Sequence, residues 1–229
     1  TGTLITSGEA ATVVNATSYH GNCSAFFASN GDGGFEGAYC YRNIPSRSEL
    51  YARGYFYISQ SGIADDDDRF YFIILRAGGN NVAYAGWRRI RGVVKWNLLI
   101  RNGTSYVDAY STTSPSLNQW YSIELHWVRD STNGRGELYV DGVSVCSISG
   151  RNTSAFGNVD QVRFGLAQLY NCGSTTIYCD YCKMSKEHIG LQSTTSASSS
   201  IIPAGLCMHA LHVPRNYFPA DIYAVVARV

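Results

Sequence analysis

The sequence of 229 residues lacks several features that would assign it to a familiar class of protein. No hydrophobic run approaches the roughly 20 residues that a transmembrane helix needs, so we expect no membrane span. Lys and Arg number 18 against 17 Asp and Glu, and the basic residues are scattered. Binding to a phosphate backbone depends on concentrated positive charge, so nucleic acid is not an expected partner. The sequence also shows no helical period of useful length and no solenoid or propeller repeat.

The sequence instead shows polar and apolar residues that alternate with a period of two. The alternation recurs in segments separated by Gly, Asn, Ser and Asp clusters, near residues 49–59, 69–76, 93–101, 119–128, 136–148, 159–168 and 175–184. This pattern is typical of a many-stranded antiparallel sandwich. The clearest local element is GELYVDGVSVCSI, in which Asp141 and Gly142 predict a tight hairpin with a primed turn.

Composition divides the chain into three parts. Residues 1–190 carry the strand pattern, residues 191–200 (LQSTTSASSS) have the composition of a linker, and residues 201–229 are apolar again and end in the strand-like IYAVVARV. An apolar strand beyond a polar linker needs a sheet edge to pair with. It either returns to its own sandwich or adds to the sheet edge of a neighbouring copy.

Seven cysteines and four Asn-x-Ser/Thr sequons together predict an oxidising, glycosylating environment, so we expect a secreted or cell-surface protein. The sequons are at Asn15, Asn22, Asn102 and Asn152. The first residue is Thr1 rather than Met, as expected of a mature chain from which an export signal has been removed.

The odd number of cysteines predicts at least one that is unpaired, metal-bound or paired between chains, and Cys207 in the tail is the candidate for the unpaired one. Cys23 with Cys40 is a reasonable local disulfide. Cys172 with either Cys179 or Cys182 is another, and spacing alone leaves the connectivity open.

Residues from about 50 to 190 resemble the concanavalin A-like, laminin G-like superfamily. The motifs that carry the resemblance are NQWYSIELHWV, NGRGELYVDGVSV, VDQVRFGLAQL and TIYCDYCKMSKEHIG. The resemblance implies an all-β fold, an antiparallel two-sheet jelly-roll sandwich. It implies no single function, because members include lectins, adhesion modules, glycoside hydrolases, polysaccharide lyases and structural domains.

Strand alternation predicts one face that is aromatic and charged rather than merely polar. If segments 49–59, 93–101 and 119–128 share a sheet, this face can bind a glycan, because sugars offer apolar C–H faces to aromatic rings and hydroxyls to planar polar groups. The candidate glycan-binding residues are Glu49, Arg53, Tyr55, Tyr57, Lys95, Asn97, Arg101, Glu124 and His126. The alternative is that Tyr and Arg simply cover a sheet that is exposed or buried between subunits.

An enzymatic alternative rests on a partial resemblance to jelly-roll alginate lyases. The chain has RSEL from residue 47, ELH from residue 124 and a looser match at 164–170. The resemblance implies that Arg47 neutralises a uronate carboxylate while His126 and Tyr170 move protons. The lysine of the third motif is missing, and Glu replaces Gln in the second. The Glu-x-Asp-x-x-Glu motif of jelly-roll glucanases does not occur in the sequence.

The superfamily resemblance also implies a structural Ca²⁺ held by Glu36 and Asp180, because Ca²⁺ prefers carboxylate and carbonyl oxygens. Four consecutive aspartates at residues 65–68 are an alternative Ca²⁺ loop, although they lack the spaced ligands of an EF-hand. Zn²⁺ at Cys179 and Cys182 is disfavoured, because residues three apart on a regular strand point to opposite faces.

These observations lead us to expect a non-catalytic protein that works by contact, with glycans or with copies of itself through the C-terminal strand. A strand donated head to tail predicts a homo-oligomer that grows into a filament or surface layer. A polysaccharide lyase acting on a uronate-containing glycan is the alternative, and a lectin module with a self-docked tail is a third hypothesis.

Overall fold

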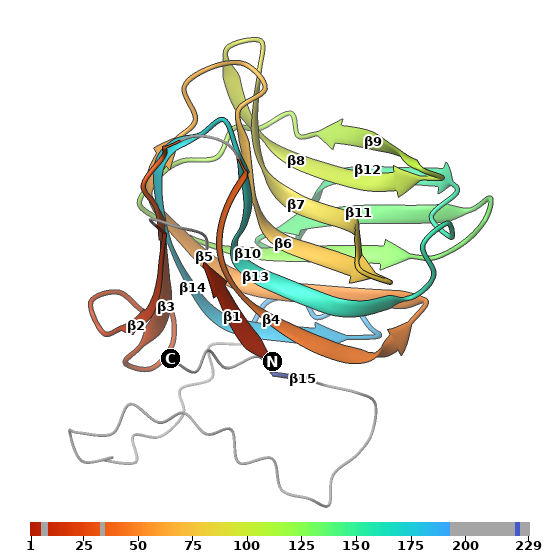
Figure 1. Ribbon diagram of the computed structural model, residues 1–229, viewed down its shortest axis with the longest axis horizontal. Coiled ribbons are helices and arrows are strands. Elements are labelled where there is room, and N and C mark those ends of the chain that lie inside the picture. The colour runs from red at the N-terminus through yellow and green to blue at the C-terminus, as the bar shows by residue number, and fades with distance from the viewer. Residues whose placement is uncertain (6–8, 33–34, 193–222, 225–229) are drawn as a thin grey trace, which may run out of the picture.

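Two antiparallel β-sheets packed face to face make up the computed structural model, which describes residues 1–5, 9–32, 35–192 and 223–224 (Figure 1). The first sheet has seven strands in the order β1-β4-β13-β6-β7-β8-β9. Their bounds are β1 Gly2–Ile5, β4 Phe35–Arg47, β13 Val159–Tyr170, β6 Arg69–Ala77, β7 Asn80–Ile90, β8 Val93–Asn102 and β9 Ser105–Tyr110.

The second sheet has eight strands, in the order β12-β11-β10-β5-β14-β3-β2 with β15 beside β14. Their bounds are β12 Val143–Arg151, β11 Gly134–Val140, β10 Trp120–Val128, β5 Glu49–Gly62, β14 Gly173–Ser185, β3 Ser24–Ser29, β2 Ala10–Val14 and β15 Tyr223–Ala224. The predicted all-β, antiparallel two-sheet jelly-roll sandwich is therefore confirmed. No helix capable of crossing a membrane is found among the described residues.

The predicted hairpin at Asp141 and Gly142 joins β11 to β12. Their φ angles are 50° and 78°, and a primed two-residue turn requires positive φ at both central positions. Glycine adopts such angles without steric cost, and aspartate tolerates them better than most residues. The turn sequence therefore sets the register in which β11 pairs with β12.

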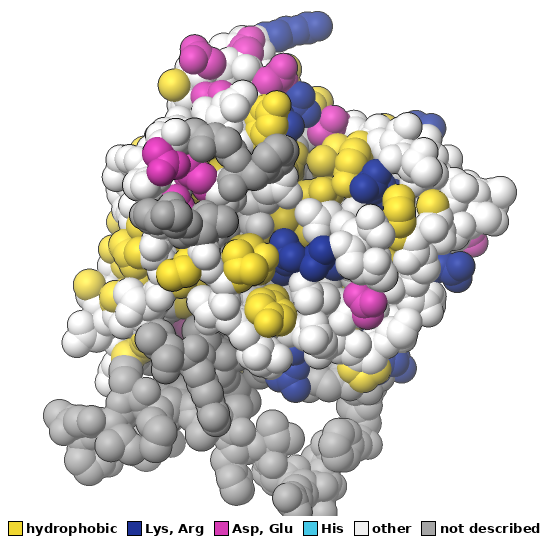
Figure 2. Space-filling model, in the orientation of Figure 1, with side chains coloured by type: hydrophobic (Ala, Val, Ile, Leu, Met, Phe, Trp, Pro, Cys, Tyr) yellow, Lys and Arg dark blue, Asp and Glu magenta, His cyan; other side chains and the backbone are white. Residues whose placement is uncertain are grey.

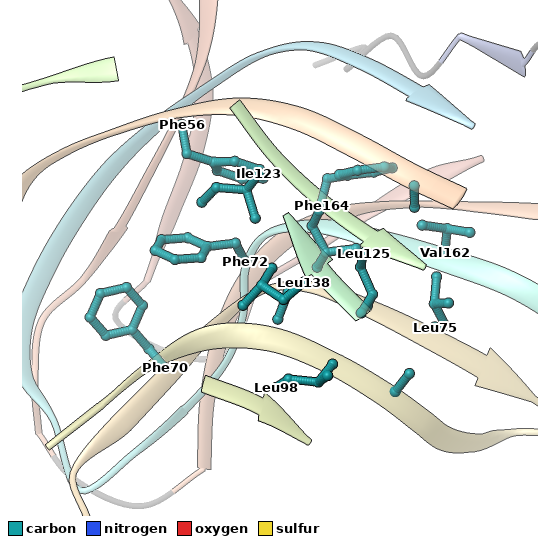
Figure 3. Packing of buried hydrophobic residues seen from close by; sticks show 14 of the residues in the cluster. Phe56, Phe70, Phe72, Leu75, Leu98, Ile123, Leu125, Leu138, Val162 and Phe164 are labelled. Atoms are coloured by element: carbon teal, nitrogen blue, oxygen red, sulfur yellow. The ribbon is translucent and has the colours of Figure 1, made fainter. Parts of the chain in front are cut away.

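The core lies between the sheets and is filled by the apolar positions that alternation predicts. On β5, Leu50, Ala52, Phe56 and Ile58 are buried in it. Figure 3 shows side chains of the eight-stranded sheet, such as Phe56 and Ile123, facing side chains of the seven-stranded sheet, such as Phe72. Each buried side chain of this size contributes about 1.5–3 kcal/mol relative to leaving it exposed.

The C-terminal part of the chain returns to the same sandwich at one described point. Tyr223 and Ala224 of β15 pair antiparallel with Met184 and Lys183 of β14. Cys207 and the remainder of the predicted linker and tail lie outside the described residues, apart from Leu191 and Gln192.

Phe72 provides a test of this core. It is fully buried, and its ring lies 5.1 Å from that of Phe56 across the sandwich and 5.2 Å from that of Phe70. We expect Phe72→Ala to lower the free energy of unfolding by about 3–5 kcal/mol in urea denaturation, because it leaves a cavity that rigid neighbours cannot fill. Phe72→Leu should cost clearly less, and a loss below about 1 kcal/mol for the alanine variant would contradict this packing.

Candidate functional site

The outer face of the eight-stranded sheet carries a cluster of aromatic and ionisable side chains at its centre. We call it the polar face and define it by Tyr51, Arg53, Glu124 and His126. Strands β5 and β10 pair so that Arg53 lies opposite Glu124 and Tyr51 opposite His126. Arg53 and His126 are therefore diagonal neighbours, about 7–8 Å apart, which is a span that one sugar ring can bridge.

His126 is held as a neutral imidazole. Its Nε2 lies 2.9 Å from Oε1 of Glu49, and its Nδ1 is buried with no hydrogen-bond partner. The ring stacks on Tyr51 with centroids 3.9 Å apart. Burial lowers the pKa of His126, and the bond to Glu49 only partly offsets this. With Nε2–H donating to Glu49, Nδ1 carries the lone pair that can accept a proton.

Arg53 is a buried cation with unused donors. Only 1% of the residue is exposed. Its Nη1 donates to the carbonyl of Gly190, while Nε and Nη2 have no hydrogen-bond partner. The guanidinium lies 5.1 Å from the ring centroid of Tyr55 and 5.6 Å from that of Tyr181. A guanidinium with two open donors matches the fork geometry of a carboxylate.

Residues 188–192 lie across the polar face, and we call them the strap. The backbone N–H groups of Ile189 and Gly190 donate to the two carboxylate oxygens of Glu124 at 2.8 and 3.0 Å. Gln192 N–H donates to the hydroxyl of Tyr55 at 2.9 Å. Burial raises the pKa of Glu124, and the N–H groups of the strap partly counter the shift. With the strap docked, only 2% of Glu124 and 2% of His126 are exposed.

Tyr19, from a different part of the chain, packs on Tyr55 beside the polar face. Its ring stacks on Tyr55 with centroids 3.6 Å apart and meets Trp120 edge-on at 5.8 Å. Oδ2 of Asp180 accepts the backbone N–H groups of Tyr19 and His20 at 3.0 and 2.9 Å and so anchors this loop. Asp180, which the resemblance implies as a Ca²⁺ ligand, thus anchors this loop.

The structure separates several residues that the sequence analysis grouped. Glu49, Arg53, Tyr55, Tyr57, Glu124 and His126 all lie on the paired strands β5 and β10. Lys95, Asn97 and Arg101 lie on β8 of the other sheet. The prediction that all nine candidate residues form one glycan-binding surface is therefore wrong. Arg47 ends β4 and Tyr170 ends β13, both also in the seven-stranded sheet. Of the three residues proposed for a lyase, only His126 is on the polar face.

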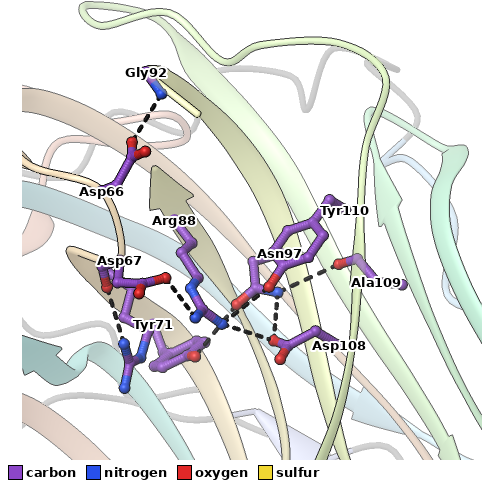
Figure 4. Close-up of polar contacts among 10 residues, drawn as sticks. Asp66, Asp67, Tyr71, Arg88, Gly92, Asn97, Asp108, Ala109 and Tyr110 are labelled. Carbon is purple, nitrogen blue, oxygen red and sulfur yellow. Dashed lines mark hydrogen bonds and ion pairs between the residues drawn. The ribbon is translucent and has the colours of Figure 1, made fainter. Parts of the chain in front are cut away.

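Asn97 belongs to a buried polar network on the seven-stranded sheet (Figure 4). Its amide donates to Asp108 at 3.0 Å, and Arg88 bridges Asp108 to Asp67. Asp66 and Asp68, which belong to the acidic run at residues 65–68, also accept backbone N–H groups, among them that of Gly92. The acidic run is thus a turn bonded to protein donors, and the described residues contain no cluster of three or more metal-ligating side chains.

The outer face of the seven-stranded sheet is also rich in Tyr and Arg. Figure 2 shows Lys or Arg side chains beside hydrophobic ones at its centre. Here the cations are covered by rings, as where Arg163 lies 4.4 Å from the ring centroid of Tyr39. The interpretation that Tyr and Arg simply cover a sheet fits this face. On the polar face Arg53 has two buried donors without partners, whereas Arg76, Arg88 and Arg89 of the seven-stranded sheet each have one.

The cysteine predictions are wrong for three of the four residues proposed. Cys23 is disulfide-bonded, but Cys40 is a free thiol, so they do not pair. Cys172 and Cys182 are free as well. The Cys172 thiol instead lies 3.2 Å from the carbonyl oxygen of Arg69. The asparagines of all four sequons, Asn15, Asn22, Asn102 and Asn152, are exposed.

Two carboxylates outside the polar face, those of Glu9 and Glu36, interact with each other. Glu9 is buried, and neither of its carboxylate oxygens has a hydrogen-bond partner. Burial and the nearby charge of Glu36 raise the pKa of Glu9 to about 7, although Asn30 and Ser29 partly offset this. The Ser29 hydroxyl also donates to Glu36. Glu9 was missed because one acidic residue before a strand carries no motif.

The sequence analysis missed other residues around the polar face. Glu137 and Tyr139 lie on β11 opposite His126 and Glu124, and the alternation in segment 136–148 was sufficient to find them. No such pattern pointed to Tyr181 or to the strap. The position of Tyr181 depends on an irregularity in β14, and that of the strap depends on contacts with Glu124, which is distant in the sequence.

The fold is similar to that of several solved structures. Cellulose-induced protein Cip1 aligns with a TM-score of 0.59 at 15% identity over 82% of this chain and 90% of its own. An endo-β-1,4-glucuronan lyase from the fungus Trichoderma reesei aligns with a TM-score of 0.59 at 12% identity, over 80% and 89%. An alginate lyase from Klebsiella pneumoniae aligns with a TM-score of 0.53 at 7% identity, over 71% and 81%. No protein-family model and no curated protein sequence matches the chain.

At such identities the likeness establishes the jelly-roll fold and nothing finer. Polysaccharide lyases recur among these similar structures, a finding that runs against the non-catalytic hypothesis. The expectation of a non-catalytic assembly or binding protein is therefore corrected.

The burial of His126 predicts that its imidazole titrates at a lower pH than an exposed histidine. Because its folded pKa lies below the ordinary 6.5, the stability that it contributes is present above about pH 6.5 and is lost as pH falls toward the folded value. We expect NMR titration to place the His126 ring below 6.5, with Glu49→Gln lowering its pKa further because Glu49 raises it. Assignment by His126→Gln identifies the signal, and a ring titrating above 6.5 would contradict this environment.

Proposed function

We propose that this chain is a polysaccharide lyase that cleaves uronate-containing glycans by β-elimination on the polar face. The observation that carries the proposal is the buried Arg53, with two unpartnered donors, diagonally across from a neutral His126 with an unpartnered Nδ1. Buried guanidinium donors without hydrogen-bond partners are costly unless a ligand completes them. The carboxylate of a uronate supplies that partner.

Three side chains take the roles that β-elimination needs. Arg53 binds the uronate carboxylate, which neutralises it and acidifies the proton on C5. Nδ1 of His126 takes this proton, the C5–H electrons form the C4–C5 double bond, and the bond from C4 to the glycosidic oxygen breaks. The hydroxyl of Tyr51 protonates the departing oxygen. Burial raises the pKa of Tyr51, which keeps this hydroxyl protonated at neutral pH.

The strap has to leave before a polymer reaches these groups, because it occupies Glu124 and one donor of Arg53. The backbone hydrogen bonds of Ile189, Gly190 and Gln192 are each worth about 0.5–1.5 kcal/mol net, or about 1.5–3 kcal/mol when the partner is charged. The His188 side chain adds contacts, with Nε2 at 3.6 Å from Oε2 of Glu124 and its ring centroid 4.7 Å from that of Tyr139. A polysaccharide with several hydroxyls and a carboxylate can replace them. Strap displacement is therefore part of substrate binding in this proposal.

The setting that fits this proposal is extracellular, because polysaccharides are outside cells and Cys23 is disulfide-bonded. The motifs of residues 50–190 and the jelly-roll likeness together support membership in the concanavalin A-like superfamily.

Incubation of the full chain with a panel of uronate polymers tests the proposal. We expect new reducing ends together with an ultraviolet-absorbing unsaturated uronate, at a rate that His126→Ala lowers about 100-fold or more. Tyr51→Phe, which keeps the ring stack, and Arg53→Lys, which keeps the charge but loses the fork, should each lower kcat. Ile189→Pro removes one N–H from the strap and should lower KM.

Arg163→Lys on the other sheet is the matched control and should leave the rate unchanged. Saturated product ends would identify hydrolysis instead of elimination. Unaltered activity in His126→Ala, or no product from any polymer with either the full chain or Ile189→Pro, would overturn the proposal.

We also propose that Glu9 and Glu36 hold a structural Ca²⁺. Two adjacent carboxylates in a buried setting are the donor type that Ca²⁺ prefers, and burial and the charge of Glu36 raise the pKa of Glu9, as expected of carboxylates without a counter-ion. The ion would stabilise the junction between the strand that follows Glu9 and β4, and it has no part in the elimination.

The raised pKa of Glu9 makes this testable. With chelator, the folded state binds a proton more tightly than the unfolded state, so the contribution of Glu9 is present below about pH 4.5 and is lost as pH rises toward 7. We expect Ca²⁺ to raise the melting temperature at pH 8, and Glu9→Gln to abolish that increase while flattening the pH dependence in chelator. Equal Ca²⁺ responses of the two proteins would rule out this site.

A further inference from the structure

Two thiols of β14 touch each other although they are three residues apart. The sulfur atoms of Cys179 and Cys182 are 3.2 Å from one another, and both cysteines are reduced. On a regular strand their side chains point to opposite faces. Their contact therefore needs a local departure from strand geometry.

A β-bulge supplies that departure. The pairing of β14 with β5 shifts register between Asp180 and Lys183, and Tyr181 adopts a φ of 48°. The left-handed region is strained for a residue with a side chain and persists only where the surroundings demand it. The extra residue turns both sulfurs toward the core and leaves Tyr181 39% exposed on the outer face.

The neighbouring strand leaves space for the second sulfur. A Cβ atom added to Gly54 of β5 would come within 3.3 Å of the Cys182 sulfur. Cys182 thus packs where β5 has no side chain, beside the fully buried Cys179. The Cys40 thiol faces the carbonyl oxygen of Phe164 instead.

We propose that Cys179 and Cys182 are a redox-active pair that closes into a disulfide within β14 and thereby fixes the bulge that holds Tyr181 over Arg53. A covalent bond of about 2.05 Å requires the sulfurs to approach by only about an ångström. Among the described residues, no third His, Cys, Asp or Glu joins these two cysteines in a group that could hold a metal ion. Disulfide formation fits this pair better than metal ligation.

The oxidant is a low-molecular-weight disulfide such as oxidised glutathione. The thiolate of Cys182, the more exposed of the two, attacks one sulfur of that disulfide and expels one thiolate. Cys179 then attacks the sulfur of Cys182 and expels the second. Two protein thiols are oxidised, one external disulfide is reduced to two thiols, and the two protons pass to the released thiolates.

The ring that the bond closes is small, so its effect on global stability is modest compared with a disulfide that closes a long loop. Its main effect is local, because the bulge can no longer relax into a regular strand. Tyr181 then stays 5.6 Å from the Arg53 guanidinium.

Peptide mapping of the full chain tests the pair without any assay of enzymatic activity. After incubation with oxidised glutathione, alkylation in denaturant and trypsin digestion, the peptide of residues 164–183 contains Cys172, Cys179 and Cys182. We expect one alkyl group in place of three, located on Cys172 by fragmentation, and recovery of all three after reduction. Amide hydrogen exchange at residues 180–182 should slow about tenfold in the oxidised protein, the direction expected when local opening is restricted.

Cys172→Ser is the matched control and should keep the bond, whereas Cys182→Ser should leave Cys179 alkylated under all conditions. Three alkyl groups after equilibration with the oxidant, or a cross-link from either cysteine to Cys40, would overturn the inference. So would unchanged amide exchange in a protein whose bond has formed, because the bulge would then not depend on it.

Discussion

A strand has two faces, and β5 can turn only one of them into the core. Leu50 and Phe56 belong to the face that packs against the other sheet. Because side chains alternate along a strand, Tyr51 and Arg53 lie on the opposite face. Pairing with β10 then brings His126 beside them in a fixed register. The relative positions of the base, the cation and the phenol thus follow from core packing and not from any local motif.

The polar face is itself buried, which is unusual for charged groups on the outside of a sheet. Residues 188–192 cover it, and they satisfy Glu124 fully but Arg53 only in part. Leaving buried donors unpaired costs on the order of 1–3 kcal/mol each, and the large core between the sheets offsets that cost. Local destabilisation of this kind, on a scaffold that is otherwise well packed, is typical of a ligand-binding site.

The burial pattern of strand β14 changes along its length. From Thr175 to Cys179 its side chains alternate between core and surface, and beyond Asp180 the bulge shifts the pattern by one residue. The same shift sends Cys182 toward the core and Tyr181 toward Arg53. A change in the oxidation state of the thiols therefore reaches the polar face through the backbone of a single turn, with no need for movement elsewhere in the sandwich.

The sequence by itself determined the all-β sandwich, the hairpin at Asp141 and the sidedness of β5, because the side chains of a strand alternate with a period of two whatever the strand pairs with. Only the tertiary structure decided which strands share a sheet. Lys95 has the same local pattern as Arg53, yet β8 joins the other sheet. Disulfide partners, the strap and the bulge that joins Cys179 to Cys182 were likewise beyond prediction, because each depends on contacts between residues whose separation along the chain carries no periodic signal.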